Sequence, residues 1–124
     1  MTQTASPEAV VHAYVAALNA GDLEAIVALY ADDASVEDPV GSAPHRGRQA
    51  IRAFYARSVA VPLEVALEGP VRVAGRECAF PFSVSLVYES QRMTFRPIDT
   101  FRFDEAGRIV QMRAYFGPAN ISRA

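Results

Sequence analysis

In the first half of the chain, apolar residues recur every three or four positions, the spacing of helices that bury one face. The first predicted helix begins after Ser6, a residue type that caps helices, and runs to about Asn19. Gly21 ends it, because glycine readily adopts the left-handed conformation found after a helix. The apolar face of this helix consists of Val10, Val11, Tyr14, Val15 and Leu18.

A second helix is predicted to start at Asp22 and to continue through Tyr30, with residues 31–33 ending it. A short strand over 34–38 follows and breaks at Pro39, because proline cannot donate to a strand ladder. A third helix is predicted over 48–58, and its apolar side is formed by Ile51, Phe54 and Tyr55.

After Pro62 the hydrophobic period changes to two, which is typical of strands. Polar turns at 89–91 and 104–107 join the later strands as hairpins. Helices followed by a meander of long strands predict an α+β fold, with three N-terminal helices packed on a curved, mainly antiparallel sheet. The predicted strands cover 63–67 with a continuation to 73, 77–88, 92–103 and 109–116.

The 124 residues are 51% hydrophobic, which suffices for one compact domain spanning 1–124. The net charge is −2, and the basic residues are arginines without any basic run, so a nucleic-acid partner is not expected. No apolar stretch reaches membrane-spanning length, and the first residues lack the pattern of a signal peptide. We therefore expect a cytoplasmic protein without a membrane partner.

Few residues could bind a metal or act as a nucleophile. Cys78 is the single cysteine, which excludes an intrachain disulfide, and its parity with apolar neighbours predicts a buried, inert thiol. His12 and His45 lie far apart without ligand spacing, and His45 is expected to be solvated. These observations predict no metal site and do not favour a Ser-His-Asp triad.

Asp99 interrupts the apolar face of the strand predicted over 92–103. Successive side chains of a strand point to opposite faces, so Asp99 shares its face with Met93, Phe95, Pro97, Phe101 and Phe103. An ionised carboxylate would lose its hydration there, so a raised pKa and a neutral acid that donates a hydrogen bond are expected. Alternatively, Asp99 pairs with a buried arginine or caps a backbone group.

Asp38 and Tyr14 are two further candidates. Asp38 shares parity with Val36, so a core-facing Val36 would bring this carboxylate to a pocket at the strand end, where it could act as a base. Alternatively, Asp38 is only a turn residue, since aspartate is common before proline in turns. The Tyr14 ring lies on the apolar face of its helix, and its hydroxyl needs a buried partner, for which Tyr30 and Tyr55 are candidates on the inward sides of their helices. Alternatively, the Tyr14 hydroxyl only completes its own hydrogen bonding, as most buried tyrosine hydroxyls do, and has no catalytic role.

Taken together, these positions resemble bacterial ketosteroid isomerase, a member of the nuclear transport factor 2-like superfamily, over nearly the whole chain. The stretches that carry the resemblance are YVAALNAGDLEAIVALYADDASVEDPVGS at 14–42, IRAFYARS at 51–58 and PIDTFRFDEAGRIVQMRAYFG at 97–117. The resemblance implies a cone-shaped fold with an apolar cavity. It also implies isomerisation of a Δ5-3-ketosteroid to the conjugated Δ4 isomer through a dienolate, without a metal or organic cofactor.

By the same resemblance, Asp38 corresponds to the general base that moves a proton from C4 to C6. Tyr14 and Asp99 correspond to the two hydrogen-bond donors that stabilise the dienolate oxygen. Tyr55 and Tyr30 would orient the Tyr14 hydroxyl. The apolar slot for the steroid would be lined by Val65, Phe82, Val84, Leu86, Phe101, Met112, Ala114 and Phe116.

The opposite face of the strand over 77–88 carries small, uncharged side chains, which is typical of a surface that meets another surface. A homodimer is therefore expected, as the resemblance also implies. Two other functions stay open. One is a dehydratase, cyclase or epoxide hydrolase on the same fold, which would need a His-Asp or Asp-Arg-Asp arrangement, and the other is a non-catalytic module that binds apolar ligands. The side chains of this face are Ala79, Pro81, Ser83, Ser85 and Val87.

Overall fold

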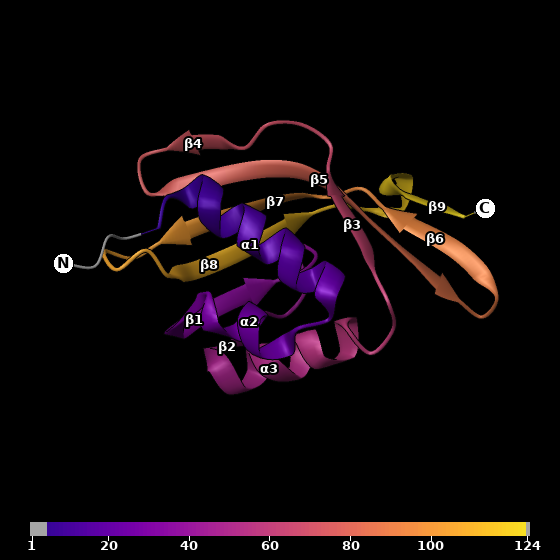
Figure 1. Ribbon diagram of the computed structural model, residues 1–124, viewed down its shortest axis with the longest axis horizontal. Coiled ribbons are helices and arrows are strands. Elements are labelled where there is room, and N and C mark those ends of the chain that lie inside the picture. Colours follow the sequence, from indigo (N-terminus) through magenta and orange to yellow (C-terminus); the bar gives the residue numbers. More distant parts are fainter. Residues whose placement is uncertain (1–4, 124) are drawn as a thin grey trace.

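The computed structural model describes residues 5–123. Within them lie three helices, α1 (Pro7–Ala20), α2 (Leu23–Ala28) and α3 (Gly47–Ser58), which pack on one face of a twisted sheet (Figure 1). Ser6 caps α1 by accepting a hydrogen bond from the Ala9 N–H, and Gly21 ends it with a φ of 65°. Asp22 caps α2 through the Ala25 N–H. The predicted first and third helices are therefore confirmed to within a residue or two.

The described strands form one mixed sheet. They are β1 (Tyr30–Glu37), β2 (His45–Arg46), β3 (Glu64–Leu67), β4 (Arg72–Ala74), β5 (Glu77–Tyr88), β6 (Gln91–Phe95), β7 (Ile98–Phe103), β8 (Ile109–Tyr115) and β9 (Ile121–Arg123). Their order is β2-β1-β8-β7-β5-β6-β9, with β3 and β4 also paired to β5. Only the β1–β8 pair is parallel among the described pairs. The predicted α+β fold is confirmed.

The second helix is shorter than predicted. It ends at Ala28, and Tyr30 is the first residue of β1 rather than part of the helix. The Ile109 N–H donates to the Leu29 carbonyl at 2.9 Å, and the Arg48 guanidinium donates to the Tyr30 carbonyl at 2.6 and 3.0 Å. These long-range bonds occupy the carbonyl groups of Leu29 and Tyr30, which a continuing helix would use for its own hydrogen bonds. As a result, β1 begins four residues earlier than the predicted strand over 34–38.

Two predicted strands are each divided. The strand expected over 92–103 breaks at Pro97, which has no N–H to donate to a ladder but accepts a hydrogen bond from the Phe82 N–H at 3.2 Å. The predicted continuation beyond Leu67 breaks as well, and β4 starts only at Arg72. As a result, β5 pairs with β4 and β7 along one half and with β3 and β6 along the other.

Two short strands and one turn of helix were not predicted. They are β2, β9 and the 3-10 helix Pro118–Asn120. Each is two or three residues long, and β2 and β9 exist only through pairing with β1 and β6. A segment of two or three residues is too short to show a hydrophobic period. For β2 and β9, the strand with which each one pairs therefore determines its structure.

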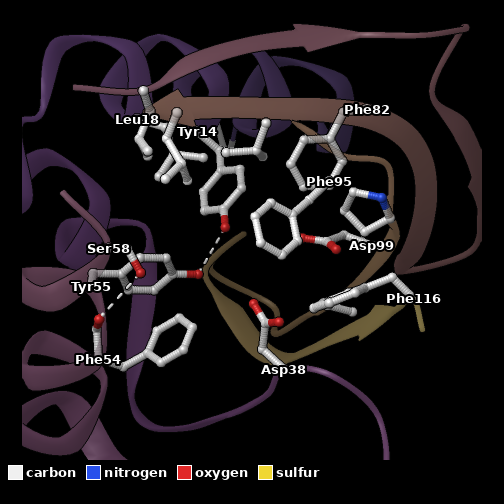
Figure 2. Close-up of a pocket in the computed structure, with 15 residues that line it drawn as sticks. Tyr14, Leu18, Asp38, Phe54, Tyr55, Ser58, Phe82, Phe95, Asp99 and Phe116 are labelled. Carbon is white, nitrogen blue, oxygen red and sulfur yellow. Dashed lines mark hydrogen bonds between the residues drawn. The ribbon is translucent and has the colours of Figure 1, made fainter. Parts of the chain in front are cut away.

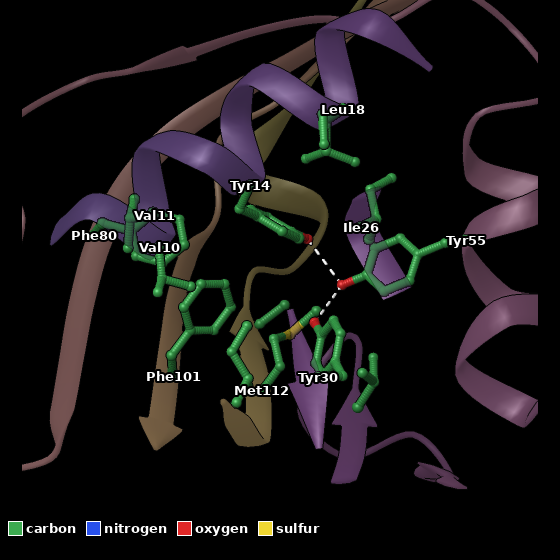
Figure 3. Packing of buried hydrophobic residues seen from close by; sticks show 14 of the residues in the cluster. Val10, Val11, Tyr14, Leu18, Ile26, Tyr30, Tyr55, Phe80, Phe101 and Met112 are labelled. Carbon is green, nitrogen blue, oxygen red and sulfur yellow. Dashed lines mark hydrogen bonds between the residues drawn. The ribbon is translucent and has the colours of Figure 1, made fainter. Parts of the chain in front are cut away.

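The core lies between the three α-helices and the sheet (Figure 3). The Tyr14 ring stands edge-on against Phe101, with centroids 5.2 Å apart. The Asn19 side chain clamps the end of α1 to β3, donating to the Val65 carbonyl at 2.8 Å and accepting from the Val65 N–H at 2.7 Å. These contacts fix the height and rotation of α1, and hence the position of the Tyr14 hydroxyl.

Candidate active site

The register of the sheet aligns two carboxyl groups. Asp99 of β7 lies opposite Ala114 of β8. Glu37 is the parallel-ladder partner of Arg113, so the next residue, Asp38, lies beside Ala114. The backbones of Asp38 and Asp99 are therefore two strands apart, about 10 Å. Figure 2 shows both carboxyl groups pointing into one pocket. Ala114, on the strand between them, also lines this pocket with its small side chain.

Asp99 is buried as an acid without a compensating charge. Its exposed fraction is 2%, and its Oδ1 has no hydrogen-bond partner within residues 5–123. The alternative of a buried arginine partner is not realised among the ion pairs of those residues. Burial raises the pKa of Asp99 well above its ordinary value, and the nearby charge of Asp38 raises it further. A neutral acid of this kind can donate a hydrogen bond into the pocket.

Asp38 directly follows the last residue of β1 and is half-buried. Burial raises the pKa of its carboxyl to about 6. At neutral pH this group is therefore ionised in most molecules, yet it binds a proton more readily than an ordinary aspartate. The pocket thus holds two acids with separated protonation states, which is the arrangement that acid–base chemistry requires.

Three tyrosine hydroxyls form a buried chain (Figure 3). The Tyr55 hydroxyl lies 2.9 Å from that of Tyr14 and 2.6 Å from that of Tyr30. Burial raises the pKa of all three phenols well above the ordinary value, so all are neutral. Of the three, Tyr14 and Tyr55 line the pocket, whereas Tyr30 lies behind them on β1. The prediction placed Tyr30 on a helix, but its inward direction was correct.

The pocket has a volume of about 240 Å³ and mostly apolar walls. Five of the eight residues predicted for the steroid slot line it: Phe82, Val84, Leu86, Ala114 and Phe116. The other three, Val65, Phe101 and Met112, are buried in the core behind this lining. Strand parity could not separate the two groups, because it gives the face of a residue but not which stretch of that face the helices cover.

The pocket lining also contains residues that the sequence interpretation did not assign to it. Leu18 follows Tyr14 by one helical turn, and Phe54 and Ser58 flank Tyr55 on α3. Phe95 and Pro97 share the parity of Asp99, so the same pattern that exposed Asp99 could have identified them. The full set of unassigned lining residues is Leu18, Phe54, Ser58, Leu63, Phe95 and Pro97.

The remaining chemical candidates lie outside the pocket lining. Cys78 is buried, as predicted, and burial raises the pKa of its thiol to about 11. His12 is exposed, whereas His45 is half-buried against the Phe54 ring at 4.8 Å rather than solvated. Among residues 5–123 no cluster of three or more potential metal ligands occurs. No helix in this range is long and apolar enough to span a bilayer.

Comparison with known proteins places the chain in a family. Residues 11–112 match the family described as the SnoaL-like domain, and the chain belongs to this family. Among curated proteins, it is 39% identical over 118 residues to the Steroid Delta-isomerase of Nocardioides simplex, covering 95% of both chains. This relative confirms the predicted resemblance to bacterial ketosteroid isomerases.

Solved structures agree with the fold. SalBIII, described as an epoxide hydrolase/cyclase-like enzyme in pyran ring formation of the polyether salinomycin, superposes with a TM-score of 0.86 at 26% identity, covering 91% of this chain and 92% of its own. RV0760c from Mycobacterium tuberculosis has a TM-score of 0.87 at 24% identity over 100% of both chains. A shared fold does not determine the reaction, so the residues of the pocket must decide the chemistry.

The perturbed pKa of Asp38 predicts a pH-dependent stability. Between its ordinary pKa and about 6, the folded state binds more protons than the unfolded state, so this group destabilises the fold progressively as pH rises through that window. We expect Asp38→Asn to be more stable than the wild type by roughly 2 kcal/mol at pH 8, and the difference to shrink towards pH 4. Urea unfolding of both proteins at the two pH values measures it. A difference independent of pH would contradict the assignment of the raised pKa.

Proposed function

We propose that the protein isomerises a Δ5-3-ketosteroid to the conjugated Δ4-3-ketosteroid by moving one proton from C4 to C6 through a dienolate. The pairing of ionised Asp38 with neutral, unpartnered Asp99 in one apolar pocket carries this proposal. The 39% identity to Steroid Delta-isomerase supports the same substrate class. Other residues of the pocket then take definite roles.

Asp38 is the general base. C4 of the substrate lies between a carbonyl and a double bond, so removing its proton sends the electron pair into a dienolate with negative charge on the C3 oxygen. Asp38 then holds the proton and returns it to C6, which reforms the carbonyl and leaves the double bond between C4 and C5. A base pKa of about 6 suits both steps, because the carboxylate must first accept and then release the proton.

Tyr14 and Asp99 donate hydrogen bonds to the C3 oxygen. Both are buried neutral donors, and the water-excluding pocket strengthens their interaction with a developing charge. The interaction is stronger in the dienolate-like transition state than with the ketone, so it lowers the barrier rather than only tightening binding. Asp99 must be protonated for this role, which its burial and the Asp38 charge favour.

Tyr55 and Tyr30 set the direction of the Tyr14 hydroxyl. Each phenol has one proton, so Tyr14 can donate to the substrate only if Tyr55 donates to Tyr14. Tyr55 in turn accepts from Tyr30, and the chain then runs from Tyr30 through Tyr55 to the oxyanion. Such a chain polarises the terminal hydroxyl and strengthens its hydrogen bond to the substrate.

The walls suit a flat polycyclic substrate. Phe82, Val84 and Leu86 alternate along β5 and present apolar side chains over about 13 Å, similar to the length of four fused rings. Phe116 lies on the opposite side of the pocket, towards β8 (Figure 2). The substrate is thus held mainly by apolar contact, with its polar end at Tyr14 and Asp99.

Epoxide opening or cyclisation is the second candidate, because SalBIII shares the fold and a neutral acid beside a carboxylate could protonate an epoxide oxygen. The described pocket lining contains no histidine and no arginine, which disfavours the His-Asp and Asp-Arg-Asp arrangements expected for such relatives.

A homodimer through the outer face of the sheet is also proposed. Ile98 and Tyr115 are ladder partners on this face, with exposed fractions of 49% and 44%, and Pro81 pairs with Ile98 on the other side. This apolar row extends the face formed by Ala79 and Ser83. Ser85 has the strand parity predicted for this face, but its side chain is buried and bonded to Thr94 at 2.9 Å.

The direct test of the isomerase proposal adds a Δ5-3-ketosteroid and follows the ultraviolet absorbance of the conjugated enone. We expect rapid turnover, with kcat/KM falling below pH 6 as Asp38 becomes protonated. Asp38→Asn should lower kcat by about 10²- to 10⁴-fold. Asp33→Asn, at an exposed position on β1, the strand that leads to Asp38, serves as the matched control and should leave kcat unchanged. Binding without turnover in the wild type would support the non-catalytic module instead.

The donor role of Asp99 predicts an order of two substitutions. Asp99→Ala removes the donor and should lower kcat by about 10²- to 10³-fold, whereas Asp99→Asn keeps an N–H donor and should lose less. The same enone assay at pH 7 measures both, with circular dichroism to verify folding. Equal losses in the two variants would contradict hydrogen-bond donation.

The dimer proposal is tested by light scattering at micromolar concentration. We expect twice the monomer mass for the wild type and a shift to monomer for Ile98→Arg, because the charge would be buried in the interface. Val61→Arg, at an exposed apolar residue outside the sheet, is the control and should remain dimeric. A wild type that is entirely monomeric would rule out the dimer.

A further inference from the structure

The loop that carries Asp38 is fastened from the outer face of the sheet. β1 ends at Glu37, and the chain then turns through Pro39 and Gly41 away from the ladder. The Glu37 carboxylate lies on the side opposite the pocket, and its Oε2 accepts a hydrogen bond from the Gly41 N–H at 2.9 Å. Gly41 has a φ of 101°, a conformation that other residues rarely adopt, so the loop closes tightly over this bond.

The same carboxylate is held from its other oxygen. Arg113 is the ladder partner of Glu37 on β8, and its Nε donates to Glu37 Oε1 at 2.9 Å. Arg113 also donates to the Tyr115 hydroxyl at 2.8 Å, and its guanidinium lies 5.4 Å from the centre of that ring. Glu37 thus joins the Asp38 loop to a side chain that is itself held in place by two further contacts.

One backbone hydrogen bond attaches the loop to the sheet beyond the end of β1. The Val40 N–H donates to the Ala114 carbonyl at 2.8 Å, which aligns Asp38 with the residue opposite Asp99. Within the loop, Ser42 bonds to the Pro39 carbonyl through its N–H at 3.0 Å and its hydroxyl at 2.6 Å. Without the Glu37–Gly41 bond, one backbone bond and this internal turn would remain to hold the Asp38 carboxylate over the pocket.

We propose that Glu37 is a positioning residue for Asp38: its carboxylate, oriented by Arg113, holds the Gly41 N–H and so fixes the loop that carries the base. This inference rests on the proposed function, in which Asp38 must reach both C4 and C6 of one bound substrate. Proton transfer is sensitive to displacement of the base by about 1 Å, which can cost about 10²-fold in rate. Tyr14 and Asp99 stand on other elements, so loosening this loop leaves ligand binding at their end of the pocket intact.

Three variants separate position from charge and from general stability. Glu37→Ala removes both bonds and should lower kcat by about 10- to 100-fold. Glu37→Gln removes the charge but keeps an oxygen for the Gly41 N–H, and it should retain most of the activity that Glu37→Ala loses. Arg113→Met keeps the Glu37–Gly41 bond, and its decrease in kcat should fall between those of Glu37→Gln and Glu37→Ala. Adding Arg113→Met to Glu37→Ala should cause no further decrease in kcat. Glu24→Ala, which breaks an exposed ion pair with Arg52, is the control and should leave kcat unchanged.

Two readouts distinguish positioning from damage to the whole pocket. Affinity for a steroid with a phenolic A ring, which engages Tyr14 and Asp99 but does not react, should be unchanged in all three variants. Hydrogen exchange of the Gly41 N–H, followed by NMR, should be slow in the wild type and in Glu37→Gln but fast in Glu37→Ala. Equal kcat losses in Glu37→Gln and Glu37→Ala, a parallel loss of phenol affinity, or unchanged Gly41 exchange in Glu37→Ala would overturn the positioning role.

If Glu37→Ala does not fold, Arg113→Met and Glu37→Gln provide the same comparison of kcat with phenol affinity. A wild type that does not turn over the ketosteroid would refute the proposed function, whereas Gly41 exchange tests the fastening of the loop independently of substrate.

Discussion

The carboxyl of Asp99 is removed from water, and no cation among the described residues replaces its lost hydration. An ionised acid in this position would be costly, so the group keeps its proton, and the negative charge of Asp38 in the same pocket reinforces that preference. Asp38 is only half-buried, so its pKa is raised to about 6 and it is ionised in most molecules at neutral pH, while Asp99 stays neutral. The two protonation states are therefore coupled through one apolar space, and the proposed chemistry uses that coupling rather than a metal or a strong base.

The fold meets this constraint by distributing the proposed catalytic groups over separate elements. Asp38 ends a strand at one side, Asp99 lies inside a ladder on another strand, and Tyr14 reaches across from α1. The small Ala114 side chain on the intervening strand leaves space between the carboxyl groups. Because β5 pairs with different partners along its two halves, it can bend beyond Phe82, and its curved course is visible in Figure 1. Val84 and Leu86 thereby continue the apolar wall beyond Phe82.

Local patterns in the sequence predict those parts of the structure that local forces determine. The cap at Ser6 and the alternation around Asp99 gave a helix and a buried acid, both of which the structure contains. Tyr30 shows the limit, because its backbone is bound by Ile109 and Arg48, and no pattern near position 30 reports residues so distant in sequence. Phe101 shows another limit. It shares a face with Asp99 but is covered by the Tyr14 ring, so whether it lines the pocket depends on where α1 lies.

The burial of Asp99 and three tyrosine hydroxyls, with Asp38 half-buried in the same pocket, has an energetic consequence. These groups lower stability relative to an apolar core, and the surrounding packing must compensate, through features such as the Asn19 clamp and the aromatic contacts of Tyr14. The outer face contributes in another way: Glu37 and Arg113 lie on the far side of the sheet from the pocket, yet their contacts hold the loop that carries Asp38. In the proposed positioning role, the placement of Asp38 depends on a partly exposed ion pair, whose net contribution to stability is small but whose geometry fixes one backbone N–H. The position of the Asp38 carboxylate and the stability of the fold can therefore depend on different residues. A residue that contributes little to stability can still be important for holding this carboxylate in place.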